Sequence, residues 1–211
     1  WRFVESRLGK PALIRETSRP HGVGKKVVEP LRNALAALRG KPATADGMTS
    51  PALAAFMKTV ILDPAVEVRL KNVAISTQNT KRNKAPFRHL LLYGPPGTGK
   101  TLFAKGLAKY SGMDYAILTG GDVAPLGRDA VTEIHKVFEW AQSSRKGVLL
   151  FVDESDAFLR RRATEAMSED LRNALNAFLF RTGEASDKFM VVYASNQPEQ
   201  FDWAINDRID E

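Results

Sequence analysis

The chain has 211 residues, of which 44% are hydrophobic and 26% charged, an ordinary composition for a soluble globular protein. It has no cysteine, which excludes disulfides and thiolate zinc sites, and its three histidines are too scattered to suggest a metal cluster. The net charge of +7 favours a solvated surface that steers anionic ligands, with binding to nucleic acid or acidic lipid as the alternative.

Segments for membrane insertion or targeting are not recognisable in the sequence. No apolar run approaches the roughly 20 residues that a membrane-spanning helix needs. Because the first residue is Trp1 rather than methionine, we expect the chain to be a fragment or a processed form. The missing segments therefore say nothing about the full-length protein.

The first 62 residues predict a segment of short helices broken by proline and glycine. Leucines at a helical spacing mark one helix over 30–39, and Ser50-Pro51 is typical of the start of another. Helices this short are not stable alone, so we expect them to pack on the rest of the chain or on a partner.

Residues 63–211 predict an α/β domain. Asp63-Pro64 begins a helix that carries Val66, Leu70 and Val73 on one side. Beyond residue 86, short apolar runs alternate with helical patterns, which predicts a parallel sheet with helices on both faces. The apolar runs are HLLLYG, YAILTG, VLLFVDE and FMVVYASN, and the helical patterns cover 100–110, 129–141 and 168–180.

A phosphate-binding loop follows the first of these runs, in LLYGPPGTGKTLF over 91–103. It matches G-x-x-x-x-G-K-[ST] between a predicted strand and a predicted helix, a context that disfavours a glycine turn without a ligand. The glycines let the backbone approach a phosphate closely, and the helix directs unpaired N–H groups at it. Lys100 is expected to reach the β- and γ-phosphates and Thr101 to ligate Mg²⁺. The residues predicted to bind the nucleotide are Gly94, Pro95, Pro96, Gly97, Thr98, Gly99, Lys100, Thr101 and Leu102.

Two acids, Asp153 and Glu154, end the third apolar run. Ligands of parallel sheets bind at the carboxyl ends of the strands, so Asp153 is placed to hold Mg²⁺, through water, and Glu154 to orient and deprotonate the attacking water. The alternative is a strand end with solvated acids, which the upstream phosphate loop disfavours. Asp156 is interpreted either as a further acid behind the site or as a helix cap.

Asn196 ends the fourth apolar run. An amide there can hold the lytic water or the γ-phosphate, but taken alone the residue is typical of a turn before Gln197-Pro198.

The phosphate loop, LLFVDES, Asn196 and a downstream arginine, in this order and spacing, resemble an AAA+ ATPase module, a P-loop NTPase fold. Longer blocks, GMDYAILTGGDVAPLGRDAV and SNQPEQFDWAINDRIDE, resemble a branch of that family formed by mitochondrial inner-membrane ATPases. The likeness covers nearly all of 61–211 and a short block near the N-terminus.

The resemblance implies roles for further residues. Asn196 would be the sensor of the γ-phosphate, and Arg208 the arginine finger that reaches a neighbouring subunit, so that the active form would be a ring, usually a hexamer. The stretch 124–129 falls where such proteins carry the central-pore loop, but it has Leu126-Gly127 where many relatives have an aromatic residue. The stretch 160–162, three arginines, would lie near a second pore loop or form a solvated basic face.

The resemblance also implies a fifth strand and a helical lid, both expected after residue 211. Strand 89–93 would then have an open edge, which we expect to be covered by the N-terminal segment, a partner chain or residues beyond this sequence. The chain alone is expected to bind nucleotide weakly and hydrolyse it poorly.

These observations predict a Mg²⁺-dependent ATP hydrolase that binds ATP and releases ADP. By resemblance its domain would lie on the matrix side of the mitochondrial inner membrane, attached through segments outside this chain. The alternative is a nucleotide-binding or empty structural subunit of a larger mitochondrial assembly. Nucleic-acid binding through the basic surface is a third, weaker interpretation.

Overall fold

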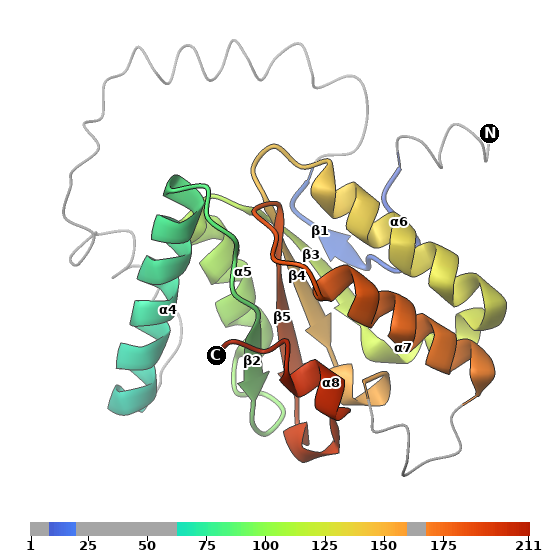
Figure 1. The fold of residues 1–211 in the computed structure, drawn as a ribbon. Coiled ribbons are helices and arrows are strands. Elements are labelled where there is room, and N and C mark those ends of the chain that lie inside the picture. Colours follow the sequence, from blue (N-terminus) through green and yellow to red (C-terminus); the bar gives the residue numbers. More distant parts are fainter. Residues whose placement is uncertain (1–8, 20–62, 160–167) are drawn as a thin grey trace.

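The computed structural model describes residues 9–19, 63–159 and 168–211, which form one five-stranded sheet with the order β1-β3-β4-β5-β2 (Figure 1). Neighbouring strands from β3 to β2 are parallel, and β1 is antiparallel to β3. The predicted α/β fold with a parallel sheet is confirmed, with an antiparallel edge strand added to it. The strands are β1 (Glu16–Thr17), β2 (Leu90–Tyr93), β3 (Asp114–Thr119), β4 (Val148–Asp153) and β5 (Phe189–Ser195).

Helices cover both faces of the sheet, as predicted (Figure 1). One face carries α4 (Pro64–Arg82) and α5 (Lys100–Ser111). The other carries α6 (Ala130–Gln142), α7 (Glu169–Thr182) and the short α8 (Trp203–Asn206). The described residues also include the 3₁₀ turns η2 (Gly120–Asp122), η3 (Ala124–Asp129), η4 (Ser155–Ala157) and η5 (Pro198–Gln200). None of the helices in these described ranges has the length and hydrophobicity needed to cross a bilayer.

Capping residues set the helix boundaries that the sequence indicated. Asp63 accepts a 2.9 Å hydrogen bond from the Ala65 N–H at the start of α4. Ser168 likewise caps α7 through the Leu171 N–H. Gly112, with φ of 66°, ends α5 in the left-handed conformation that glycine adopts without a steric penalty.

Two apolar cores sandwich the sheet and hold its central strand rigidly. Val148, Leu150 and Val152 of β4 pack toward α6 and α7, whereas Leu149 and Phe151 pack toward α5. All five side chains are at least 96% buried. Burial on both faces explains why β4 is a continuous apolar run rather than an alternating one. The end of β4 is therefore a fixed platform for the polar residues that follow it.

The N-terminal residues differ from the helical segment predicted for 1–62. Within 9–19 the chain is extended, and Glu16–Thr17 form β1 against β3. Leu13 and Ile14 are buried in the core beside α6. The helices expected over 30–39 and after Ser50 lie outside the described residues.

The free edge of β2 is partly covered by the last residues of the chain itself. The Asp210 N–H donates to the His89 carbonyl (3.0 Å), and the Leu91 N–H donates to the Glu211 carbonyl (2.9 Å). The Asp210 carboxylate also accepts the His89 N–H at 2.7 Å. The described N-terminal residues lie at the opposite edge of the sheet, so this part of the segment does not provide the expected cover.

Candidate nucleotide-binding site

The carboxyl ends of the parallel strands bring the predicted site residues to one edge of the sheet. Tyr93 at the end of β2 is in register with Ser195 at the end of β5, and Thr119 of β3 with Asp153 of β4. The Gly94 N–H donates to the Ser195 carbonyl at 3.3 Å. The phosphate loop, Asn196 and the acidic pair therefore all leave the sheet on the same side.

The backbone of the phosphate loop has the conformation that its glycines predict. Gly94, Gly97 and Gly99 have φ values of 144°, 80° and 87°. At Gly97 the space that a Cβ would occupy is open, so the positive φ rather than crowding requires glycine. Because Gly99 has no side chain to cap α5, the first N–H groups of that helix are available to an anion.

Lys100 connects the loop to the strand that carries Asn196. Its Nζ donates to the carbonyls of Gly94 (2.8 Å) and Pro95 (2.9 Å) and to Asn196 Oδ1 (3.2 Å). Thr98 closes the same turn by donating to the Pro95 carbonyl. The ammonium group is thus held at the mouth of the loop, where an incoming phosphate would exchange with these acceptors.

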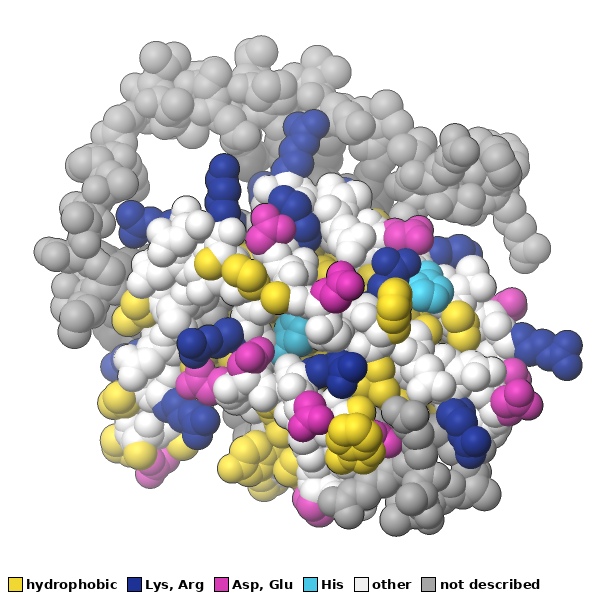
Figure 2. All heavy atoms as spheres, in the orientation of Figure 1, with side chains coloured by type: hydrophobic (Ala, Val, Ile, Leu, Met, Phe, Trp, Pro, Cys, Tyr) yellow, Lys and Arg dark blue, Asp and Glu magenta, His cyan; other side chains and the backbone are white. Residues whose placement is uncertain are grey.

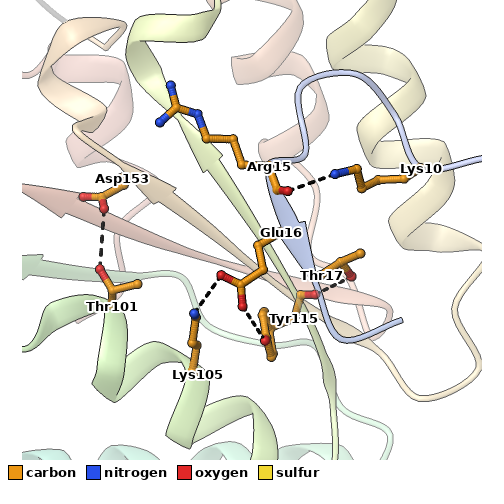
Figure 3. Close-up of polar contacts among 8 residues, drawn as sticks. All are labelled: Lys10, Arg15, Glu16, Thr17, Thr101, Lys105, Tyr115 and Asp153. Carbon is orange, nitrogen blue, oxygen red and sulfur yellow. Dashed lines mark hydrogen bonds and ion pairs between the residues drawn. The ribbon is translucent and has the colours of Figure 1, made fainter. Parts of the chain in front are cut away.

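Thr101 and Asp153 face each other from α5 and β4, with Thr101 Oγ1 3.5 Å from Asp153 Oδ2 (Figure 3). Both residues are half-buried. Hydroxyl and carboxylate oxygens fit Mg²⁺, which usually takes one or two protein ligands and completes its shell with water and phosphate oxygens. Within the described residues no cluster of three or more His, Asp or Glu side chains is placed to hold a metal.

Glu154 is exposed and has a left-handed backbone, with φ of 47° and ψ of 41°. This conformation costs a non-glycine residue roughly 1–2 kcal/mol. Its N–H donates to Asp153 Oδ1 at 3.0 Å, which helps to hold the turn. A strained backbone persists only where the surrounding structure holds it, and such residues cluster at functional sites. The conformation of Glu154 therefore supports a functional role.

Arg208 lies against its own chain on the α7 and α8 side of the sheet. Its Nη1 donates to the Ala204 carbonyl (2.6 Å) and its Nε to the Leu179 carbonyl (3.2 Å). The predicted role in a neighbouring site stays a prediction. The stretch 124–129 forms η3, with Gly127 at φ of 50°, and 160–162 lies outside the described residues.

Two features next to the site were not found from the sequence. One is an apolar cavity of about 430 Å³ between α4 and β2, lined in part by Val66, Leu70 and Phe103 and bordering the phosphate loop. The helical spacing of Val66 and Leu70 predicted that they share one face of the helix, but it did not predict that this face lines a cavity. The other is the ion pair between Arg15 and Asp122, within electrostatic reach of the acidic residues. No sequence signal links these two residues, because they are far apart in the chain.

Residues 90–211 match the family model of the ATPase family associated with various cellular activities (AAA). This match covers more than half of the chain and agrees with the fold and the loop geometry. The chain belongs to the AAA ATPase family.

Within that family the chain is similar to proteins named ATPase family AAA domain-containing protein 3. It is 61% identical over 213 residues to the protein of that name from Bos taurus, and 59% identical to ATPase family AAA domain-containing protein 3A from Homo sapiens. The Caenorhabditis elegans protein is 59% identical over 212 residues. Each alignment covers all of this chain but only 33–34% of the relative, so the chain spans about a third of the length of these proteins.

Proposed function

We propose that this protein is a Mg²⁺-dependent ATP hydrolase, which converts ATP and water to ADP and phosphate. The observation that carries the proposal is the convergence of four side chains at one sheet edge. Lys100 contacts Asn196, and Thr101 faces Asp153, beside a loop with three positive-φ glycines. Membership of the AAA ATPase family supports the same activity.

Binding would rest on the loop and the adjacent cavity. The N–H groups at the start of α5 and the Lys100 ammonium complement the negative charge of a triphosphate. The apolar cavity between α4 and β2 suits a purine base, since cofactor pockets are mainly apolar with a few polar groups. Leu102, 49% exposed in the first turn of α5, would border the nucleotide on the solvent side.

Hydrolysis would rest on the polar ends of β4 and β5. Thr101 and Asp153 would hold Mg²⁺, Asp153 through water. The ion would supply positive charge to the phosphate oxygens. Glu154 would orient the attacking water and accept its proton, while Asn196 would contact the γ-phosphate or that water.

A ring, usually of six subunits, is part of the proposal. Arg208 would release the Leu179 carbonyl and bind a phosphate in the neighbouring subunit. Such a finger increases the rate by roughly 10³-fold or more. The sequence blocks that resemble mitochondrial inner-membrane ATPases support a location on the matrix side of that membrane, with attachment through segments outside this chain. Protease protection in isolated mitoplasts tests this location.

The replacement Glu154→Gln tests the proposed hydrolysis. It removes the proton acceptor but keeps the size and most hydrogen bonds of the side chain, so turnover should fall by at least about tenfold while ATP binding stays. Phosphate release and fluorescent-nucleotide binding measure the two effects. Glu184→Gln, an exposed change on the loop before β5, is the matched control and should keep turnover. Equal turnover in Glu154→Gln and the wild type would remove Glu154 from this role.

A structural subunit is the second candidate. It is favoured by the bonds that hold Arg208 on its own chain. A purified chain that binds nucleotide, releases no phosphate and migrates only with other subunits would support it.

Nucleic-acid binding is a weaker candidate, because acidic side chains are interspersed with the basic ones on the face in Figure 2. It would require an affinity that falls steeply with salt and needs no nucleotide.

A further inference from the structure

Residues 10–19, here called the N-terminal strap, are integrated into the sheet at the β3 edge (Figure 1). The Arg15 N–H donates to the Ile117 carbonyl (2.8 Å), and the Ser18 N–H to the Tyr115 carbonyl (3.1 Å). Leu13 and Ile14 are 97% and 99% buried. The strap therefore has a fixed position relative to the end of β3.

Arg15 and Glu16 leave the strap in different directions (Figure 3). Glu16 binds Lys105 of α5 and the Tyr115 hydroxyl. Arg15 instead binds Asp122 in the η2 turn that follows β3. Its Nε and Nη2 each lie 2.6 Å from one carboxylate oxygen, so the pair is bidentate.

The η2 turn packs against Glu154. A Cβ at Gly120 would lie 2.5 Å from the Glu154 carbonyl oxygen, which means that the two backbones are in direct contact. A Cβ at Gly121 would lie 4.0 Å from Glu154 Oε2. A shift of this turn would therefore move the Glu154 backbone, which carries the carboxylate.

The Arg15–Asp122 pair is suited to orienting the η2 turn rather than to stabilising the fold. The two side chains are 58% and 35% exposed, and exposed ion pairs add little net stability. A bidentate guanidinium–carboxylate contact, however, fixes direction as well as distance. The hydrogen bond to Asp122 raises the pKa of Arg15, and Glu154 and Asp153 raise it further, so the guanidinium lies within the electrostatic reach of both acids.

We propose that Arg15 is a positioning residue for ATP hydrolysis: through Asp122 it holds the η2 turn in place, and that turn holds Glu154. Arg15, rather than the strap as a whole, then contributes to hydrolysis. This inference rests on the proposed function, because it assumes that Glu154 activates water.

Steady-state kinetics of the intact protein test the inference. Arg15→Gln removes the bidentate contact, so kcat should fall by about tenfold, since a misplaced catalytic group loses rate without losing substrate binding. KM for ATP and nucleotide binding should stay near the wild-type values. The matched control is Glu16→Gln, which removes an anchor of the same strap on its other side and should keep kcat. If the strap had only a structural role, the two replacements would change kcat to the same extent.

A double-mutant cycle identifies the route of the effect. If Arg15 acts through Asp122, Asp122→Asn should lower kcat to a similar extent, and the double variant should be no worse than either single one. The inference would be overturned if the losses in kcat of the two single variants multiplied in the double variant, or if Arg15→Gln left kcat unchanged. Either result would leave the proposed hydrolysis by the wild-type protein intact. A wild-type protein that releases no phosphate would overturn both the inference and the proposed function.

Discussion

His89 is a buried titratable side chain at the start of the strand that leads to the phosphate loop. It is 95% buried, and its Nδ1 accepts a 3.1 Å hydrogen bond from the Val191 N–H of the neighbouring strand. Burial lowers the pKa of His89, and the nearby Asp210 carboxylate opposes this shift less strongly. The neutral ring is thus part of the contact between β2 and β5.

The stability of the fold should decrease in acid because of this residue. The unfolded chain binds a proton at His89 at a higher pH than the folded chain does, so stability is full above about pH 6.5 and falls as the pH decreases toward the lowered pKa. Urea unfolding at about pH 7.5 and about pH 5 measures the loss. In His89→Asn the new side chain keeps an acceptor near the Nδ1 position but does not titrate. The free energy of unfolding of this variant should therefore decrease less over the same pH range. An equal loss in the two proteins would contradict the assignment.

Single residues were predictable where their role depends on the local backbone. Gly94, Gly97 and Gly99 need positive φ, and the motif alone placed them correctly. Arg15 was not predictable, because its partner is 107 residues away and nothing in the sequence marks the pair. The hydrogen bond from Arg208 to the Leu179 carbonyl was not predictable either, because nothing in the sequence marks these two residues as a pair.

At the scale of elements, the contact between the η2 and η4 turns determines where Glu154 lies. Gly120 starts η2 directly after β3, and Glu154 precedes η4 directly after β4. A Cβ at Gly120 would also approach Phe158 Cβ to 3.3 Å. Backbone and core atoms cannot move away as a flexible side chain could.

Gly120→Ala should therefore separate the two turns. Overpacking of this kind costs typically 1–3 kcal/mol, and we expect a loss of about that size in the free energy of unfolding, together with reduced turnover. Urea unfolding and phosphate release measure the two effects. Gly121→Ala is the matched stability control, because its Cβ would meet only ordinary contact distances and should change stability by less than about 0.5 kcal/mol. Equal stability of the two variants would contradict the close contact.

Long elements were predictable from periodicity and capping, and short ones were not. The apolar run of β4 and the Asp63-Pro64 start of α4 gave the correct type and nearly the correct bounds. The strand β1 has only two residues, Glu16 and Thr17, so it shows no alternation that could predict it. Its position follows from pairing with β3 and from the burial of the two residues before Arg15, which are tertiary effects.

At the scale of the whole molecule, residues from the two ends of the chain lie at the two edges of the sheet, and they cover the β2 edge only in part. The N-terminal strap pairs with β3, and Asp210 and Glu211 pair with β2. The four parallel strands were predicted from the alternation of apolar runs with helical patterns. The strap could not be placed in the same way, because an edge strand can pair with any free edge.

Arg208 links the molecule to its proposed assembly. Its guanidinium binds the carbonyls of Leu179 in α7 and Ala204 in α8. The proposed role in catalysis would have Arg208 leave these carbonyls for the site of a neighbouring subunit. In a ring each site would combine Glu154 of one subunit with Arg208 of the next.

Mixing two inactive variants should restore activity in such a ring. Glu154→Gln subunits lack the proton acceptor but keep the finger, and Arg208→Ala subunits have the reverse defect. In random mixed rings, about a quarter of the interfaces join an intact Glu154 to an intact Arg208, so phosphate release should recover toward about a quarter of the wild-type rate. The double variant mixed with Arg208→Ala is the control and should stay inactive, because no subunit then supplies an arginine. Failure of the first mixture to recover, although both variants assemble into the same particles, would mean that Arg208 does not act across the interface.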